Sequence, residues 1–435
     1  MQTNFTLAQL ADPHVAFSER ILRKCVHCGF CTATCPTYLT LGDELDSPRG
    51  RIYLIKDMLE SGRPADARTA THIDRCLSCL SCMTTCPSGV DYMHLVDHAR
   101  AHIEETWRRP LADRLWRALL ATVLPRPGRF RLALAAARLA RPLQPVLARL
   151  PALAPLAAML ALAPARLPKP APAAAPAAVA GGRRVAMLTG CAQAVLAPSI
   201  NAAAGELLAR LGVTVVAAPG EGCCGALVHH MGREAEALAA ARNNVDAWTR
   251  LIEDGGLDAI LITASGCGTT VKDYGHMLRL DAAYAAKAAR VAGLTKDITE
   301  YLDALDPPHS AVGAGLRLAY HSACSMQHGQ RIREQPKRLL AAAGFTVLDV
   351  PEGHLCCGSA GTYNILQPRI AARLKARKLA NVARLSADLL ATGNIGCITQ
   401  LGADASVPVV HTVELLNWAH GGSKPPAMTG GGGPQ

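Results

Sequence analysis

Beyond about residue 183, the chain alternates between short apolar runs and longer amphipathic stretches. The apolar runs predict strands, at 185–188, 259–263, 316–320 and 389–392. Longer stretches with helical spacing lie at 233–252 and 368–385. Strands that alternate with helices imply a parallel sheet, in which the loops at the carboxyl ends of the strands gather at one edge. This part of the chain is therefore predicted to be α/β.

The α/β part contains an internal duplication. Residues 207–219 read LLARLGVTVVAAP and residues 339–351 read LLAAAGFTVLDVP, each with a helix, a glycine and a strand in that order. Gly212 and Gly344 are placed to end their helices. The period is about 130 residues, too long for a solenoid repeat, so we expect two tandem domains of one fold.

Eight cysteines in the first ninety residues form two copies of the run C-x2-C-x2-C-x3-C-P. The run is typical of bacterial [4Fe–4S] sites, in which the fourth cysteine binds the other cluster. Disulfides, or zinc on the C-x2-C pairs, are the alternatives, but neither explains the third cysteine and the proline. We therefore expect two [4Fe–4S] clusters with crossed ligands. The first set is Cys25, Cys28, Cys31 and Cys86, and the second is Cys76, Cys79, Cys82 and Cys35.

The other eight cysteines are divided equally between the duplicated domains, each of which carries a Cys-Cys-Gly (CCG) motif. The two sets are Cys191, Cys223, Cys224 and Cys267, and Cys324, Cys356, Cys357 and Cys397. Each set is expected at strand ends, and the two sets are expected to face one shared cleft. There each set can hold a metal centre, form a redox-active thiol pair or serve in packing. Six histidines are candidate ligands or proton carriers without an assigned role: His229, His230, His321, His328, His354 and His411.

Charge and proline are concentrated between the two parts. The chain has a net charge of +11. Residues 114–184 hold twelve Arg or Lys and no acid, alternating with Leu and Ala. Their prolines should prevent any long helix, and no apolar stretch reaches the roughly 18 residues of a membrane span. Such a segment suits attachment to an anionic membrane surface, with a solvated linker as the alternative.

Other functions are less well supported. No flavin, nicotinamide or Walker A fingerprint is found, and nothing indicates nucleic-acid binding. Residues 1–24 show no signal peptide, so sixteen cysteines argue for metal ligands in the reducing cytoplasm, with the inner face of the cell membrane as a peripheral location. Basic neighbours of the first eight cysteines should raise the reduction potentials of the clusters: Arg23, Lys24, Arg49, Arg51 and Arg75.

The predicted fold class is α+β and multidomain, with a helical ferredoxin-like domain before two tandem α/β CCG domains. The expected divisions are 1–110 for the ferredoxin domain, 111–182 for the basic Ala/Pro-rich segment, 183–312 and 313–420 for the CCG domains, and 421–435 for a disordered tail. Within the basic segment, residues 167–182 read as a flexible linker.

Several stretches carry a family resemblance. Residues 49–61, between the two cysteine runs, are expected to form a helix. With it, the N-terminal module resembles the helical ferredoxin of succinate dehydrogenase iron–sulfur subunits. The CCG domains resemble those of heterodisulfide reductase, whose pattern ends in C-x2-C, but Thr270 and Gln400 stand at the last cysteine here. The cysteine runs within 25–60 and 75–92, together with TASGCGTTVKDYGHML at 263–278 and HLCCGSAGTYNILQP at 354–368, resemble the iron–sulfur subunits of bacterial glycolate oxidase.

That resemblance implies an electron-transfer subunit of a glycolate dehydrogenase complex. FAD would reside only in partner subunits, which oxidise glycolate to glyoxylate. This chain would pass electrons to quinone or another respiratory acceptor and would not oxidise glycolate alone. The alternatives are a glycerol-3-phosphate or lactate dehydrogenase complex, a heterodisulfide-type thiol reductase, and an iron–sulfur sensor or scaffold.

Overall fold

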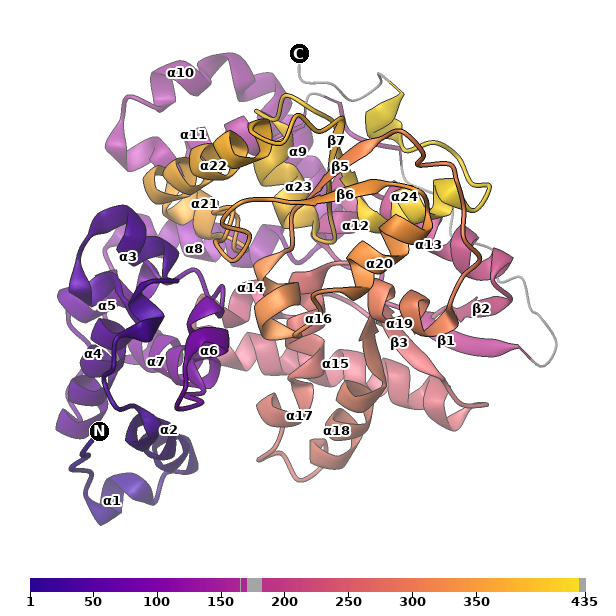
Figure 1. The fold of residues 1–435 in the computed structure, drawn as a ribbon. Coiled ribbons are helices and arrows are strands. Elements are labelled where there is room, and N and C mark those ends of the chain that lie inside the picture. The colour runs from indigo at the N-terminus through magenta and orange to yellow at the C-terminus, as the bar shows by residue number, and fades with distance from the viewer. Residues whose placement is uncertain (165, 170–181, 430–435) are drawn as a thin grey trace.

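The computed structural model describes residues 1–164, 166–169 and 182–429. Its N-terminal module is helical (Figure 1). The elements are α1 (Leu7–Leu10), α2 (Pro13–Lys24), η1 (Phe30–Thr32), α3 (Pro36–Leu41), η2 (Glu44–Asp46), α4 (Pro48–Ser61), α5 (Ala67–Asp74), α6 (Ser81–Thr85) and α7 (Tyr92–Thr106).

Helix α4 lies between the two cysteine runs, where the sequence predicts a helix at 49–61. The Ser47 side chain accepts a hydrogen bond from the Gly50 N–H, Pro48 occupies the first turn, and Gly62 ends the helix at φ 63°. Its inner face buries Ile55 against Leu95 of α7 in one apolar cluster. This packing fixes the distance between the two cysteine runs.

Two α/β units follow, and each contains a four-stranded parallel sheet. The first has β1 (Arg183–Met187), α12 (Ala192–Leu196), α13 (Ser199–Arg210), β2 (Val213–Val216), α14 (Ala226–His229), α15 (Glu234–Glu253), β3 (Ala259–Ile262), α16 (Ser265–Lys272), α17 (Tyr274–Met277), α18 (Ala285–Leu294), β4 (Thr295–Asp297) and α19 (Ile298–Leu305). The second has β5 (Arg317–Tyr320), the π-helical turn η5 (Ser325–Gly329), α20 (Gln335–Ala342), β6 (Thr346–Asp349), α21 (Tyr363–Leu366), α22 (Pro368–Ala383), β7 (Leu389–Thr392), α23 (Ile395–Gly402), β8 (Val409–His411) and α24 (Thr412–Ala419).

The two sheets have the same strand order, β2-β1-β3-β4 and β6-β5-β7-β8. The α+β fold class and the duplicated α/β units are thus confirmed, and Gly212 and Gly344 end their helices at φ 73° and 92°. The fourth strands, β4 and β8, were not predicted. Each is only three residues long, and β4 reads Thr-Lys-Asp, a pattern without an apolar run.

One hydrophobic core joins the two units. It contains residues from both sheets, among them Val185 of β1 and Leu318 of β5. Helix α24 of the second unit packs on α13 of the first, and the His411 ring bonds the Thr263 carbonyl at 2.8 Å. His411 also caps α24 through the Val413 N–H. The two units therefore pack as one pseudo-symmetric body.

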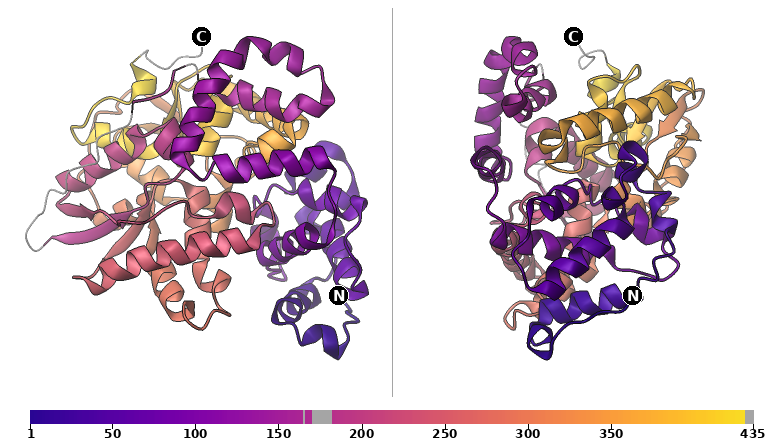
Figure 2. Two further views of the ribbon diagram at one scale, coloured as in Figure 1. Left: turned by 180° about the vertical axis from the view of Figure 1, so that it is seen from behind. Right: turned by 90° about the vertical axis from the view of Figure 1, so that its left-hand side faces the viewer.

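Residues 111–162 differ from the expectation that their prolines prevent any long helix. They form α8 (Leu111–Val123), α9 (Pro127–Ala140), η3 (Arg141–Leu143), α10 (Gln144–Leu147), η4 (Pro151–Leu153) and α11 (Ala154–Leu162). Most of the prolines fall in first turns, as Pro127 does in α9, where no backbone donor is needed, and Pro125 lies in the turn between α8 and α9. Figure 2 shows these helices across the outside of the molecule. Much of the predicted linker lies outside the described residues.

Several contacts attach this helical segment to the rest. Leu120 and Ala121 of α8 are buried with Val228 and Ile365, one from each α/β unit. Arg109 and Arg117 both pair with Asp74 of α5, at 2.6 and 2.9 Å. The segment therefore spans all three parts of the fold.

The expected disordered tail also differs over 421–429. The turn η6 (Pro426–Met428) places Ala427 and Met428 against the shared core. Residues 430–435 lie outside the described part. Among the described residues, no helix combines the length and the apolarity needed to cross a bilayer.

His94 provides a testable link between the ferredoxin module and the first α/β unit. Its ring lies between Asp91, at 2.6 Å, and Asp273, at 2.9 Å. Burial alone would lower the pKa of His94, but the hydrogen bonds to Asp273 and Asp91 raise it to about 10. The charged ring therefore stabilises the folded chain fully below the ordinary histidine pKa of 6.5, and this contribution is lost as the pH rises towards 10.

We expect His94→Gln to lower the free energy of unfolding by about 1.5–3 kcal/mol at pH 6, the range for hydrogen bonds to charged groups. Denaturant unfolding at pH 6 and pH 9.5 measures this, and the difference between variant and wild type should shrink at the higher pH. His102→Gln is the control, because His102 lies on the same helix and makes only a long bond to the Arg63 carbonyl. A pH-independent loss would contradict the interpretation.

Candidate metal centres

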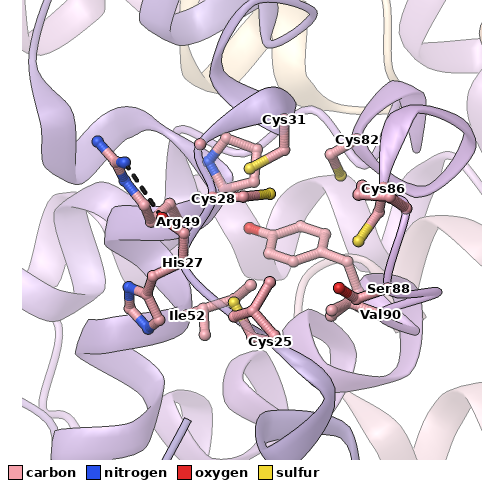
Figure 3. A pocket seen from close by; sticks show the side chains of 15 residues that line it. Cys25, His27, Cys28, Cys31, Arg49, Ile52, Cys82, Cys86, Ser88 and Val90 are labelled. Carbon is pink, nitrogen blue, oxygen red and sulfur yellow. Dashed lines mark hydrogen bonds between the residues drawn. The ribbon is translucent and has the colours of Figure 1, made fainter.

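Four thiols of the N-terminal module line one pocket. Cys25 directly follows α2, Cys28 and Cys31 lie in the next turn, and Cys86 follows α6. Figure 3 shows their sulfurs directed towards the same space, with Cys82 at its inner side. Cys28 is exposed, so this group lies near the surface.

The second group is buried. Cys76, Cys79 and Cys82 are each about 8% exposed, and Cys35 is 5% exposed. Burial, then the proximity of Cys324, Cys35 and Cys76, raises the pKa of the Cys79 thiol. Cys35 thus accompanies the second trio and Cys86 the first, which is the grouping required by crossed ligation. The ligation itself stays a prediction.

The same backbone feature gathers each trio. In both runs the second and fourth residues after the first cysteine are left-handed: His27 and Gly29 at φ 56° and 85°, Ser78 and Leu80 at φ 48° and 62°. A non-glycine residue in this conformation costs roughly 1–2 kcal/mol. This local strain turns the chain twice within five residues and directs three thiols to one side.

The electrostatic environment of the second group depends on one buried arginine. Arg51 is 1% exposed, and its Nη1 lies 3.9 Å from the Cys35 sulfur. Its partner Asp46, also bound by Arg75 and His72, is fully buried. Asp46, Asp43 and His72 are spaced for a metal ion, but the two arginines already neutralise Asp46. By contrast, the side chain of Arg23 is 65% exposed.

The first CCG unit brings its four cysteines together. The sulfurs of Cys191 and Cys223 lie 3.5 Å apart, and Cys224 contacts both Cys223 and Cys267. Hydrogen bonds from the Cys191 and Cys224 thiols lower the pKa of Cys223. The lowered pKa favours the thiolate form of Cys223, an arrangement suited to thiol chemistry as well as to ligation.

The second CCG unit also brings its four cysteines together, but among different neighbouring residues. The Cys324 and Cys356 sulfurs lie 3.7 Å apart, and those of Cys357 and Cys397 lie 3.4 Å apart. Cys324 and Cys356 pack with Cys79 in one apolar cluster, whereas Cys224 and Cys267 pack around Trp248 in another. We expected both sets to face one shared cleft. Instead, the second set faces the ferredoxin module, because that module covers its CCG loop.

The six candidate histidines have different surroundings. His229 and His230 face Asp97, at 3.3 and 3.8 Å. His328 bonds Thr84 and the His354 carbonyl, and His411 caps a helix. His321 is 1% exposed, beside Cys357 and Cys397. Only His321 is placed as a ligand.

Some functional candidates were not found from the sequence. Arg100 bonds the Cys76 carbonyl at 2.7 Å, and the Tyr92 hydroxyl lies 3.7 Å from the Cys76 sulfur. A cavity between the ferredoxin module and the first unit is rich in histidine. Its histidines are His14, His94, His98, His229 and His276. His94 and His98 lie four residues apart on α7, and His14 lies on α2. The helical spacing of the two histidines on α7 was the available signal.

Comparison with known proteins agrees with these sites. The 4Fe-4S dicluster domain matches residues 21–90, and the cysteine-rich domain matches 185–272 and 318–402. The chain is therefore an iron–sulfur protein with one dicluster domain and two cysteine-rich domains.

Full-length relatives identify the family. The chain is 44% identical to the glycolate oxidase iron-sulfur subunit of Escherichia coli, over 96% of this chain and 99% of the relative. It is 30% identical to the probable glycolate oxidase iron-sulfur subunit of Bacillus subtilis, over 93% and 96%. Lactate utilization protein A of Geobacillus kaustophilus is 28% identical over 54% of this chain and 98% of the relative. The chain belongs to the family of glycolate oxidase iron–sulfur subunits, as the resemblance predicted.

Arg51 yields a prediction on redox potential. Its buried positive charge should stabilise the reduced, more negative form of a cluster bound through Cys35. We expect Arg51→Gln to lower that cluster's potential, and Arg51→Lys, which keeps the charge, to lower it less. Redox titration followed by electron paramagnetic resonance measures the shift.

Arg23→Gln is the matched control, because the Arg23 side chain is largely exposed. Removing Arg51 also leaves Asp46 short of a partner, which typically costs about 3–5 kcal/mol of stability. Titrations should therefore use protein whose iron content equals that of wild type. An unchanged potential in Arg51→Gln at full iron content would contradict the prediction.

Proposed function

We propose that this chain is the electron-transfer subunit of a glycolate-oxidising complex. In this proposal, FAD-binding partner subunits oxidise glycolate to glyoxylate, and this chain carries the electrons to the respiratory quinone pool. The observation that carries it is the pair of four-thiol groups in a chain that matches glycolate oxidase iron–sulfur subunits over nearly its whole length.

The residues fit two [4Fe–4S] clusters. All sixteen cysteines are free thiols, and eight of them form two groups of four in the dicluster domain. We assign Cys25, Cys28, Cys31 and Cys86 to one cluster and Cys76, Cys79, Cys82 and Cys35 to the other. When bound, such clusters carry one electron each. The protein sets their separation, burial and surrounding charge.

The placement of the two groups suggests their order. The first is rimmed by exposed apolar side chains, with Val26 66% and Phe30 60% exposed. Exposed apolar side chains of this kind mark protein contacts, so a partner subunit is proposed to dock here. The second group lies deeper, beside Cys356 and the Arg100–Asp97 pair that leads to His229. Quinone reduction takes up protons as well as electrons, and the histidine-rich cavity supplies proton-carrying side chains on that side.

The sibling assignments receive less support. Relatives named lactate utilization protein A match only 50–54% of this chain, whereas the glycolate oxidase subunits match 93–96%. A thiol reductase acting at the CCG cysteines is the second candidate. It is favoured by the hydrogen bonds that lower the pKa of Cys223.

The whole-complex experiment is anaerobic purification with the partner subunits, followed by iron analysis and a panel of 2-hydroxy acids. We expect glycolate-dependent quinone reduction by the complex and no glycolate-dependent dye reduction by the isolated, flavin-free chain. In the complex, Cys79→Ser should abolish quinone reduction while glycolate still reduces the flavin. Preference for lactate or glycerol 3-phosphate would overturn the glycolate assignment.

Crossed ligation can be tested by iron counting in double variants. If Cys28 and Cys86 bind one cluster, Cys28→Ser with Cys86→Ser should lose about four of about eight irons per chain. Cys28→Ser with Cys35→Ser should then lose nearly all. Uncrossed ligation predicts the reverse for the two pairs. Each double variant therefore serves as the control for the other.

Membrane attachment is proposed for the helical segment 111–162, at the inner face of the cell membrane. Its outer surface combines leucines with arginines. Leu132 is 73% and Leu139 86% exposed, and Arg131 and Arg138 precede them. Near an anionic surface, each basic residue contributes about 1 kcal/mol, and buried leucines add to this.

We expect Leu132→Ser with Leu139→Ser to reduce binding to anionic liposomes severalfold in flotation, without loss of iron. Binding of the wild type should fall with salt and be weak on neutral lipid. Ala133→Ser with Ala136→Ser, on the same helix, is the control for the loss of helix propensity. Deletion of the segment is unsuitable, because Leu120 and Ala121 are part of a core. Equal flotation of all variants would favour a solvated, lipid-free surface.

A further inference from the structure

His321 is a buried histidine whose ring has no hydrogen-bond partner among the described residues. It directly follows β5, and its backbone N–H donates to the Ala391 carbonyl at 2.9 Å. The side chain is 1% exposed, and within the described residues neither ring nitrogen has a hydrogen-bond partner. An unsatisfied buried polar group costs about 1–3 kcal/mol, so its retention requires a reason.

One ring nitrogen of His321 lies close to two thiols. One His321 nitrogen and the sulfurs of Cys357 and Cys397 all lie within 4.8 Å of one another, and all three residues are buried. The two sulfurs are 3.4 Å apart. A tetrahedral ion with metal–sulfur bonds of about 2.3 Å separates its sulfur ligands by about 3.8 Å. The three donors therefore have the spacing of ligands to a single ion.

The charge of the surroundings also fits. Lys378 is 2% exposed, and its amine donates to the Glu352 carbonyl at 2.8 Å. Burial lowers the pKa of Lys378, while the nearby thiols Cys357, Cys356 and Cys397 and the Glu352 carboxylate favour its charged form. A divalent ion with two thiolates and a neutral imidazole has no net charge, and Lys378 can balance a third thiolate from Cys356.

The first unit lacks this arrangement. Leu188 occupies the equivalent position: it directly follows β1, stands three residues before the first cysteine and donates its N–H to the Leu261 carbonyl at 3.0 Å. It is 3% exposed and belongs to the apolar cluster around Trp248. The duplicated folds therefore differ at the one position where a nitrogen ligand can enter.

We propose that His321, Cys357 and Cys397 bind one thiophilic divalent ion of the zinc class, and that the first unit has no such site. Sulfur and imidazole donors at this spacing suit zinc. Cys356, which contacts Cys357, is the nearest further donor. Binding releases the protons of the two thiols and joins the end of β5, the CCG loop and the start of α23.

Zinc can be measured without interference from iron. The full chain is purified anaerobically from zinc-supplemented cells, and zinc and iron are counted by mass spectrometry. Zinc K-edge absorption then gives the ligand types. We expect about one zinc per chain, with metal–sulfur distances of about 2.3 Å and a nitrogen shell at about 2.0–2.1 Å. Zinc absent from the wild type, or an all-sulfur shell, would overturn the proposal.

The variants test His321 directly. His321→Leu introduces the residue of the first unit, which packs without strain there, and should lower zinc at least tenfold while iron is unchanged. Cys397→Ser should do the same. His354→Leu is the matched control and should retain zinc, because His354 lies close to the CCG loop but is not one of the three donors within 4.8 Å of one another. Wild-type zinc in His321→Leu would refute the histidine ligand.

Two further outcomes are informative. If His321→Leu loses iron as well, His321→Gln, which is polar and of similar volume, replaces it, with the same tenfold loss of zinc expected. If the wild type instead carries iron in excess of about eight per chain, and the excess is lost in Cys397→Ser but kept in His321→Leu, a cluster bound by cysteines alone replaces the proposed site.

Discussion

The N-terminal module is organised by one requirement, that four thiols meet at each of two points. Short spacers supply three thiols only if the chain turns sharply, and His27, Ser78 and Leu80 adopt left-handed backbone conformations to do so. In the proposed ligation, the fourth thiol of each group comes from the other run, and α4, a helix of fourteen residues, lies between the two runs. The packing of α4 on α7 and the buried Arg51–Asp46 pair hold the two runs at the required separation.

Much of this could be predicted from the sequence, because cysteine spacing and glycine caps are local signals. Helix α4, the main strands and the duplication were found in this way. Strands β4 and β8 were missed, because three-residue strands at a sheet edge carry no periodic pattern. The helices of 111–162 were missed because prolines were counted as breakers, although Pro127 lies in a first turn.

The surroundings of the CCG cysteines could not be predicted from the sequence. Their gathering within each unit follows from the strand–loop–helix pattern. However, the proximity of Cys356 to Cys79 depends on how the ferredoxin module docks. His321 was one of six histidines without distinction in the sequence. Its assignment as a candidate ligand depends on its burial and on the absence of hydrogen-bond partners among the described residues, which the sequence does not show. The comparison of Leu188 with His321 shows that two copies of one fold have diverged in the chemistry they can support.

The docking of Tyr363 on the dicluster domain has a consequence for biosynthesis. Its hydroxyl donates to the Arg75 carbonyl, 288 positions earlier, and with Cys356 it covers the side of the module that holds Cys79. On the ribosome the N-terminal module emerges long before this cover. The inner cysteines are therefore accessible to cluster-delivering proteins during synthesis and are closed once the C-terminal unit folds. Clusters would therefore have to reach the inner cysteines before the C-terminal unit has folded.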